Sequence, residues 1–460
     1  MRKRNLNGKY LAAATAAVLL AAALTACGTA ATSDNSSAVS STAQTSQTIQ
    51  TSQETQTSEN TQTSVSSSYT GQADTAAKAS SADTALDTES LFTDRDLTQT
   101  ADLSEAEYIT VKDGENITIT SAGTYVFTGT ASGVTITVEA GDEDKVQLVL
   151  DGVSISNKDF PCIYVKNADK VFVTTTGTEN SLFVTGTFTD DGTTNTDAVI
   201  FSKDDLVLNG TGTLNISSSD NGISCKDDLK ITGGTYYISS QSDALEANDS
   251  VYMDDGVIVI KTGEDGVHVE NDEDDTVGNF YMGGGSLTIT AGDDAVHATT
   301  ILQIDGGEIN ISAAEGLEAT WVQINDGTIS ITASDDGING AHKSSAYTPT
   351  IEINGGTITI DMGAGDTDAV DSNGNIYMNG GTLTITAQSA FDYDGTAEYN
   401  GGTIIVNGVQ VNSITNQMMG GMGMQQGGFG GQPGDFGGQG GFGQQGGTQP
   451  GGNTGFGPRR

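Results

Sequence analysis

The chain has 460 residues, with 18 Lys and Arg against 60 Asp and Glu, and a formal net charge of −42. Such an acidic protein is a poor partner for nucleic acid and for anionic lipid surfaces, because like charges repel. The same composition favours divalent cations as ligands. Besides Cys27, only Cys162 and Cys225 are present, and we expect both to be core thiols, although a disulfide between them stays open.

Residues 1–27 have the features of a lipoprotein signal peptide. Four basic residues within the first ten precede an apolar, Ala-rich run at 11–24 that is short for a membrane span. The stretch "LTAC", residues 24–27, resembles the bacterial lipoprotein box, in which cleavage leaves Cys27 as the lipidated N-terminus. We therefore expect an extracellular protein anchored to the cell membrane through this lipid. The alternative is an ordinary signal peptide with a chance cysteine.

Two low-complexity segments flank the central part of the chain. Residues 28–104 are rich in Ser, Thr, Gln and Ala, and residues 413–460 are rich in Gly and Gln. Neither segment has enough large apolar residues to form a core. The sequence predicts a disordered stalk and a disordered tail.

Between residues 105 and 412, alternation of apolar and polar residues predicts strands and no helix. Strand pairs around a Gly-rich corner recur, as in "LQIDGGEINIS", "VQINDGTISIT" and "IEINGGTITID". The repeat length is 21 to 22 residues, with two longer steps at the loops "NDEDDTVGN" and "HKSSAYTPT". A fixed period with three short strands per unit predicts an all-β, right-handed parallel β-helix, in preference to a β-sandwich or a leucine-rich horseshoe. We expect residues 105–195 to form its first coils, with a separate N-terminal β-domain as the lesser alternative.

An acidic phrase precedes each strand pair, as in "GEDGVHV", "AGDDAVHA" and "SDDGING". The phrase contains a polar anchor residue, an apolar residue two positions later, and then a residue that alternation turns outward. The anchors are Asp197, Asn221, Asp243, Asp265, Asp294, Glu315, Asp336, Asp368 and Ser389. The outward residues are Ser224, Glu246, His268, His297, Glu318, Asn339, Asp371 and Asp392. Stacking of coils predicts two parallel columns along one edge.

Carboxylates stacked in this way repel each other by roughly 3 kcal/mol per pair at an effective dielectric constant of about 20. Protonation offsets this repulsion, and so does Ca²⁺, which prefers clusters of oxygen ligands. We predict calcium sites along the columns, with Asn339 completing them. The candidate ligands are Asp243, Glu264, Asp265, His268, Asp293, Asp294, His297, Glu315, Glu318, Asp335, Asp336, Asp366, Asp368 and Asp371. The alternatives are solvated corners that keep the protein soluble, and zinc held through His268 and His297.

A second outward column carries aromatic side chains suited to sugar rings. The middle residue of each "apolar-x-apolar" strand is Lys230, Tyr252, Tyr281, Gln303, Gln323, Glu352 or Tyr377 in successive coils. Tyrosines on adjacent coils make a flat apolar surface with polar rims, which suits a pyranose. The candidate ligand-binding residues are Tyr252, Tyr281, Tyr377 and the single tryptophan, Trp321.

The lipobox, the acidic phrases, the "INGGTITI" strands and the block "GTYVFTGTASG…DKVQLVLDGVSI…IYVKNADKV" resemble the bacterial secreted carbohydrate-binding domain-containing proteins. The resemblance covers residues 105–412. It implies a calcium-containing right-handed parallel β-helix, similar in shape to pectate lyases, that binds cellulose and acidic plant polysaccharides such as polygalacturonate.

Pectate lyases pose the main rival function. The resemblance matches their calcium-binding acids loosely, but the base that abstracts a proton is in doubt, because residues 196–408 contain five lysines and no arginine. Lys343 follows "DDGINGAH" and is the one candidate base. We therefore expect a non-catalytic, calcium-dependent polysaccharide-binding protein and a monomer. The alternatives are a polysaccharide lyase and a purely structural or adhesive solenoid.

Overall fold

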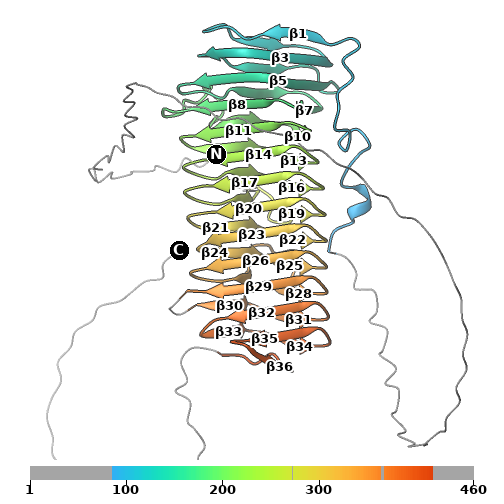
Figure 1. The fold of residues 1–460 in the computed structure, drawn as a ribbon, viewed down its shortest axis with the longest axis vertical. Helices are drawn as coiled ribbons and strands as arrows, with labels where there is room; N and C mark the ends of the chain where they lie inside the picture. Colours follow the sequence, from blue (N-terminus) through green and yellow to red (C-terminus); the bar gives the residue numbers. More distant parts are fainter. Residues whose placement is uncertain (1–84, 272, 364–366, 418–460) are drawn as a thin grey trace, which may run out of the picture. The chain divides into compact units, whose positions relative to one another are not determined.

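The computed structural model describes residues 85–271, 273–363 and 367–417, and these form a parallel β-helix (Figure 1). Apart from one short 3-10 helix, η1 (Thr88–Ser90), the elements in these ranges are β-strands. No helix in this part of the chain is long and apolar enough to cross a membrane. The predicted fold class is confirmed. The signal peptide, Cys27 and residues 28–84 of the predicted stalk lie outside the described ranges.

Each coil contains three short strands, as the repeat predicts. The first strand of each coil belongs to a sheet of 12 parallel strands, and the other two belong to a sheet of 24 strands. The 12-strand sheet contains β2 (Ile117–Ile119), β4 (Ile136–Glu139), β6 (Ile163–Asn167), β9 (Ala198–Ser202), β12 (Asn221–Cys225), β15 (Leu245–Ala247), β18 (Val267–Val269), β21 (Asp294–Ala298), β24 (Glu315–Ala319), β27 (Ile338–Gly340), β30 (Asp368–Ser372) and β33 (Ser389–Tyr393).

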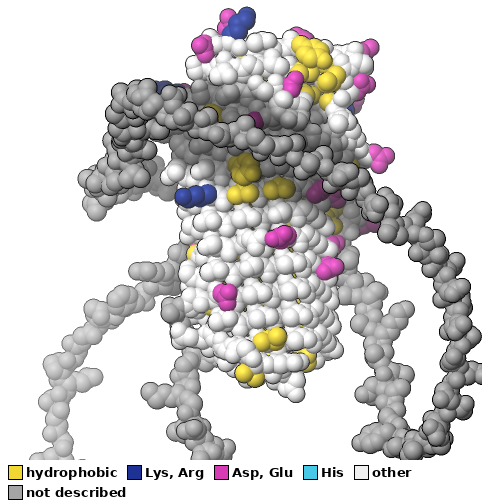
Figure 2. Space-filling model, viewed as in Figure 1, with side chains coloured by type: hydrophobic (Ala, Val, Ile, Leu, Met, Phe, Trp, Pro, Cys, Tyr) yellow, Lys and Arg dark blue, Asp and Glu magenta, His cyan; other side chains and the backbone are white. Residues whose placement is uncertain are grey.

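The larger sheet contains two parallel stacks of strands, which we call stack 1 and stack 2. Stack 1 contains β7 (Lys170–Thr175), β10 (Asp205–Gly210), β13 (Asp228–Ile231), β16 (Ser250–Met253), β19 (Asn279–Met282), β22 (Ile301–Ile304), β25 (Trp321–Ile324), β28 (Thr350–Ile353), β31 (Asn375–Met378) and β34 (Ala397–Tyr399). Stack 2 contains β8 (Glu179–Val184), β11 (Thr213–Ser218), β14 (Thr235–Ser239), β17 (Val257–Lys261), β20 (Ser286–Thr290), β23 (Glu308–Ala313), β26 (Thr328–Ala333), β29 (Thr357–Met362), β32 (Thr382–Thr386) and β35 (Thr403–Val406). Figure 2 shows the face of the coils on which stack 2 lies, where charged side chains are few.

Long strands and a hairpin form the two ends of the helix. Near the N-terminal end, β3 (Gly123–Ser132) and β5 (Lys145–Asn157) each run through both stacks, and β1 (Glu107–Thr110) pairs with β3. At the other end, β36 (Val409–Val411) folds back antiparallel to β35. Residues 105–195 are therefore the first coils of the same solenoid, as expected.

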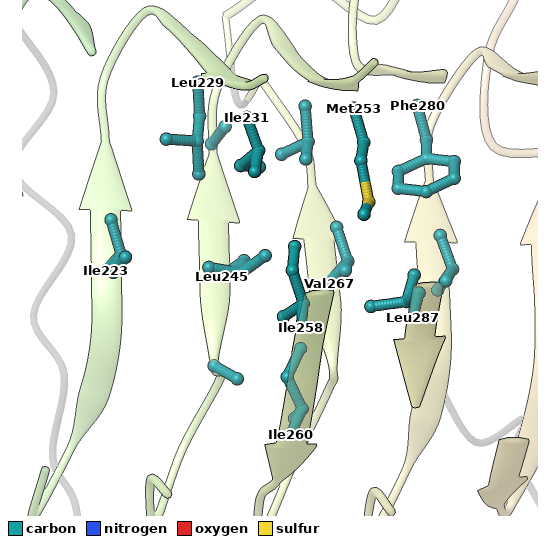
Figure 3. Packing of buried hydrophobic residues seen from close by; sticks show 14 of the residues in the cluster. Ile223, Leu229, Ile231, Leu245, Met253, Ile258, Ile260, Val267, Phe280 and Leu287 are labelled. Carbon is teal, nitrogen blue, oxygen red and sulfur yellow. The ribbon is translucent and has the colours of Figure 1, made fainter. Parts of the chain in front are cut away.

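The core consists of apolar columns, one residue per strand, that stack from coil to coil. Ile223, Leu245 and Val267 lie in register in the 12-strand sheet and are all buried (Figure 3). Burying such a side chain stabilises the fold by about 1.5–3 kcal/mol before entropy is counted. Cys162 and Cys225 are free and buried in this core, which confirms the expected thiols.

The corner between stack 1 and stack 2 is held by a ladder of asparagine amides, which we call the amide corner. Asn354 donates to Asn325 Oδ1 (2.8 Å), Asn379 donates to Asn354 Oδ1 (2.8 Å), and Asn400 donates to Asn379 Oδ1 (2.9 Å). The chain then turns at glycines with positive φ, such as Gly356 at 79°, where a Cβ would lie 2.9 Å from the carbonyl oxygen of Gly327. This close approach is why the repeat carries glycine after the amide.

Residues 85–104 lie along the outward face of stack 1, and we call them the strap. The backbone N–H of Ala85 donates to Gln323 Oε1 (3.0 Å), and Lys230 donates to the carbonyl oxygen of Leu91 (2.9 Å). Further along, the buried Asp96 carboxylate pairs with Lys170 (3.4 Å). The composition placed these residues in a disordered stalk, which is wrong for 85–104, because specific polar contacts hold them in place where apolar burial is small.

The chain also stays attached to the coils beyond residue 412. The N–H of Gln417 donates to the carbonyl oxygen of Phe391 (2.9 Å), and Asn416 donates to that of Tyr393 (2.6 Å). The predicted boundary of the tail at 413 is therefore too early by about five residues. Residues 418–460 lie outside the described ranges.

Candidate metal and ligand site

The anchor residues form a ladder at the edge of the 12-strand sheet, which we call the acid corner. The backbone N–H of Asp243 donates to Asn221 Oδ1 (2.9 Å), that of Asp265 donates to Asp243 Oδ1 (2.8 Å), and that of Asp294 donates to Asp265 Oδ1 (2.8 Å). In these coils each anchor thereby satisfies a backbone donor of the next coil. Asp243 and Asp265 each use Oδ1 for this bond, which leaves Oδ2 for other contacts.

The outward column lies beside the anchors with the predicted register. The paired residues are Ser224, Glu246, His268, His297, Glu318, Asn339, Asp371 and Asp392, each aligned with the next. The repeat therefore predicts correctly which polar side chains become neighbours.

We call the part of the column from His268 to Glu318 the upper half. There, histidine and lysine side chains neutralise the acids. The His268 and His297 rings stack with centroids 4.8 Å apart and an interplanar angle of 8°. His297 Nδ1 lies 2.9 Å from Glu318 Oε2 and 3.2 Å from Asp294 Oδ2, and Lys343 Nζ lies 2.9 Å from the same Glu318 oxygen. Asp265 pairs similarly with His268 Nδ1 at 2.7 Å.

The titration behaviour of this half follows from those contacts. Burial disfavours the charged form of His297, but hydrogen bonds to Asp294 and Glu318 outweigh it and raise the His297 pKa to about 10. Burial likewise works against the Glu318 carboxylate, yet His297 and Lys343 hold its pKa below the usual value. These groups form an ionised, internally neutralised cluster at neutral pH.

We call Asn339, together with the anchors Glu315 and Asp336, the lower half. Its two carboxyl groups form no ion pair with a basic side chain in the described ranges. Burial, together with nearby Glu318 and Asp294, raises the pKa of Glu315 to about 8. Burial and the charge of Asp371 raise the pKa of Asp336 to about 7. Asn339 donates through Nδ2 to Glu315 Oε2 (3.0 Å) and to Glu318 Oε1 (3.1 Å), while its Oδ1 is buried and has no hydrogen-bond partner in the described structure. The charged forms of the Glu315 and Asp336 carboxyls are therefore disfavoured, whereas His and Lys stabilise the charged Glu318 in the upper half.

The structure brings together some of the predicted ligands and separates others. Three groups have ligand atoms within 4.8 Å of one another: Asp243, Asp265 and His268; Asp265, Asp294 and His297; and Asp294, Glu315 and Glu318. Asp336 and Asp368 are also neighbours, since the N–H of Asp368 donates to Asp336 Oδ1 (3.3 Å).

The first acid of each acidic pair does not join these groups. Glu264, Asp293 and Asp335 are exposed, because the strand begins at or after the second acid and only that side chain turns toward the column. Their prediction as ligands beside the anchors is corrected accordingly. Asp366 lies outside the described residues.

The predicted aromatic face on stack 1 is not open. Tyr252 and Tyr281 are in register, as expected, but Phe92 of the strap lies against both rings, with centroids 6.5 and 6.3 Å away. Tyr281 is only 8% exposed. The expected exposure of this pair is wrong, because the strap occupies the surface that a sugar would need.

The other two aromatic candidates are partly exposed. Trp321 packs edge-on against Tyr347 with centroids 5.3 Å apart, and its indole nitrogen is buried without a partner in the described structure. Tyr377 lies in register with Glu352. Both remain candidates, but the residues in register with them on the adjacent coils are not aromatic.

Sequence reasoning missed the most exposed aromatic side chain of stack 2. Tyr237 is 47% exposed, whereas its neighbour Tyr236 is buried in the core. The strand "TYYIS" carries the same alternation that located the stack 1 tyrosines. Applying it to the second strand of each repeat would have identified Tyr237.

Comparison with known proteins identifies the family of this chain. The model of the carbohydrate-binding domain-containing protein family matches residues 113–364 and, in a second match, residues 315–418. A carbohydrate-binding domain-containing protein of Acetivibrio thermocellus is 35% identical over 128 residues, which are 27% of this chain and 45% of the relative. The chain thus matches less than half the length of that relative.

A solved structure, described as the polysaccharide lyase-like protein from C. thermocellum in a gadolinium derivative, is 23% identical. The alignment covers 66% of this chain and 94% of that one, with a TM-score of 0.32. The two family matches together span well over half of the sequence. The chain belongs to the carbohydrate-binding domain-containing protein family.

Proposed function

We propose that this protein is a non-catalytic polysaccharide-binding protein of the cell surface that depends on calcium. Membership of a carbohydrate-binding family supports binding of a polysaccharide. The groups of neighbouring ligand atoms at the acid corner support binding of a metal ion. The observation that carries the proposal is the unbalanced lower half of the column. There, the half-buried carboxyls of Glu315 and Asp336 have raised pKa values and form no ion pair in the described ranges, and Asn339 Oδ1 is buried without a partner.

The oxygen donors of this lower half are of the kind that Ca²⁺ prefers, and one of them, Glu315, has a ligand atom within 4.8 Å of those of Asp294 and Glu318. Glu315, Asp336 and Asn339 offer carboxylate and amide oxygens, which are the ligands that calcium prefers. The upper half fits a metal less well, because His297 and Lys343 already neutralise Glu318. Bound calcium would supply positive charge and free coordination positions for sugar carboxylates or hydroxyls. The protein's carboxylates hold such an ion only when deprotonated, so affinity rises with pH through about 7 to 8.

The state of Lys343 argues against a lyase. A general base must be neutral to accept a proton. Burial favours the neutral form of Lys343, but the charge of Glu318 and its hydrogen bond outweigh burial and raise the Lys343 pKa. A lysine held as an ammonium by a carboxylate 2.9 Å away is suited to neutralising charge.

The test is co-sedimentation of the full chain with insoluble cellulose and with covalently cross-linked polygalacturonate beads, which stay insoluble in EDTA, with calcium or with EDTA. Ultraviolet absorbance of unsaturated uronates is followed in the same samples. We expect binding without new absorbance and loss of binding in EDTA. Rising absorbance that is abolished in Lys343→Ala would make the protein a lyase.

A pair of adjacent variants locates the ion. Asp336→Asn removes a half-buried carboxylate of the lower cluster, while Asp335→Asn removes the same charge from the exposed neighbouring position. Calorimetric titration with Ca²⁺ should show weaker binding for Asp336→Asn only. Calcium uptake that stabilises the fold without any retention on polymer would support the structural solenoid.

The lipid anchor is part of the same proposal. Cys27 in "LTAC" is the residue that would carry it. In cells, Cys27→Ser should move the protein from the membrane fraction to the medium. Unchanged membrane association of this variant would remove the anchor from the proposal and leave glycan binding untouched.

A further inference from the structure

A shallow hollow on the outward face of stack 2 has features of a ligand site. It lies over β11, β14 and β17 and has a volume of about 310 Å³. Its lining includes Phe183, Asn215, Tyr237, Val259 and Lys261. Figure 2 shows hydrophobic side chains at this level of the coils, with a basic side chain beside them. No residue of the strap lines it, because the strap covers stack 1 and meets these coils at Gly210 and Thr232, at the corner between the stacks.

The Tyr237 ring lies at the centre of this hollow and is open to solvent. Cross-strand pairing places Asn215 on one side of Tyr237 and Val259 on the other. The ring is 47% exposed, and no described aromatic side chain stacks on it. Tyr252, by contrast, is covered by Phe92. An exposed phenol flanked by an apolar and an amide side chain offers a stacking face with a polar rim.

Lys261, at the end of β17, is distinctive among the described lysines. The structure describes ten lysines, and the nine others each lie within 4 Å of an acidic side chain. Lys261 is exposed and forms no such pair in the described ranges. Its strand neighbours are Ser239 and Thr290, which are neutral. In a chain of net charge −42, an unpaired ammonium beside an aromatic ring attracts an anionic group.

The surface below the hollow is a flat column of short polar side chains. In line with Tyr237 and Val259 follow Thr288, Asn310, Ser330, Thr359 and Thr384. Successive coils are about 4.8 Å apart. The column thus presents a hydroxyl or amide group at each step, with two exposed acids beside it, Glu308, which accepts from Asn310, and Asp361.

We propose that the hollow around Tyr237 binds one pyranose of an anionic polysaccharide, with the ring on Tyr237 and the acidic substituent paired with Lys261. The polymer continues along the column of hydroxyls. This inference rests on the proposed polysaccharide binding and adds a subsite whose cation is a lysine. It therefore differs from the acid corner, where binding passes through a metal ion.

The test measures dissociation constants of the full chain for soluble polygalacturonate and for a soluble neutral β-glucan, by affinity electrophoresis with calcium. Tyr237→Ala should weaken binding of both polymers by about 5- to 20-fold, since stacking is lost. Tyr237→Phe keeps the ring and should bind nearly as the wild type does. Lys261→Gln should weaken polygalacturonate binding about 2- to 5-fold at low salt and leave the neutral polymer unchanged.

Matched controls separate the subsite from general surface effects. Tyr108→Ala removes a tyrosine that is 66% exposed on β1, and Lys158→Gln removes an exposed lysine paired only with Asp159. Neither control should change affinity. Both test side chains are exposed, so all variants should melt at the wild-type temperature.

The outcomes distinguish the two proposals. If the wild type binds and Tyr237→Ala binds equally well, the subsite is overturned and the proposed function stands. Failure of the wild type to bind either polymer overturns both. If Tyr237→Ala instead converts a dimer to a monomer in sedimentation experiments, the occupant of this face is a second copy of the chain and the glycan subsite is wrong.

Discussion

The amide corner and the acid corner stack polar side chains on the same coils in different ways. At the amide corner, each asparagine donates to the asparagine of the preceding coil and accepts from the next, so the ladder is satisfied by its own members. At the acid corner, a carboxylate such as Asp265 accepts a backbone N–H but has nothing to donate. Its charge then needs a proton, a cationic side chain or a metal ion. An acid also fits the amide corner where a donor faces it, since Asn325 donates to Asp305 Oδ1 (2.7 Å).

The largest expected effect comes from removing the shared anion of the upper half. Glu318→Gln leaves the buried His297 cation and Lys343 without their common partner, and we expect a loss of about 3–5 kcal/mol in the free energy of unfolding. Urea denaturation in EDTA measures it. Glu308→Gln, at an exposed position of β23, is the control. Equal stability of the two variants would show that the upper half is not a coupled ion cluster.

The pH dependence of stability should reflect the lower half. The folded-state pKa values of Glu315 (about 8) and Asp336 (about 7) lie above their unfolded values, so the folded state binds more protons between about pH 4.5 and 8. His297, with a pKa of about 10, acts in the same direction above pH 6.5. Stability in EDTA should therefore fall as pH rises through this window.

After allowance for solvent screening, we expect the fall to be on the order of 2–3 kcal/mol. Calcium should reduce it, because the ion replaces the protons. Melting temperatures measured at several pH values with EDTA or calcium test both statements. A melting temperature that rises from pH 5 to pH 8 in EDTA would contradict the account of the acid corner.

An acid placed in the amide corner should destabilise the fold at neutral pH and less so at low pH. Asn354→Asp removes the donor to Asn325 Oδ1 and sets a carboxylate beside that oxygen. We expect a loss of about 1–3 kcal/mol at neutral pH. The loss should shrink below about pH 4, where the new carboxyl is protonated and donates again. A penalty that does not change with pH would mean that shape, and not charge, limits this corner.

The smallest effect is expected from an amide placed in the acid corner. Asn221 already accepts the next backbone N–H as Asp243 does, so Asp243→Asn keeps that bond. Its stability in EDTA should stay within about 0.5 kcal/mol of the wild type. Asp243→Ala removes the acceptor and should cost about 1 kcal/mol by thermal denaturation. If both variants lost the same stability, Asp243 would not be stabilising the fold as a hydrogen-bond acceptor.

The repeat made much of this architecture predictable. One apolar and one outward residue in each phrase defined two columns, and the register from Ile223 to Phe391 and from Ser224 to Asp392 is as predicted. The period works because coils of equal length place equivalent residues one above another. The same logic located the calcium candidates that lie within the strand. It failed for Glu264, Asp293 and Asp335, because alternation does not apply before the strand begins.

The strap was not predictable for a different reason. Its contacts join residues far apart in sequence, such as Lys230 with Leu91, and they are mostly single hydrogen bonds to backbone groups. Composition reports apolar burial, and the strap has little of it apart from residues such as Phe92. Sequence patterning therefore could not show that Tyr252 and Tyr281 are covered.

The path of the strap also determines where mechanical load enters the domain. The strap meets the solenoid at β25, where Ala85 bonds to Gln323, and then runs back over the earlier coils toward β1. Tension applied ahead of Ala85 first reaches single hydrogen bonds at Gln323 and Gln303, and only later the buried pair of Asp96 with Lys170. A pull from that side would therefore load the contacts of the strap one after another, beginning with those to β25 and β22, before it reached the stacked coils.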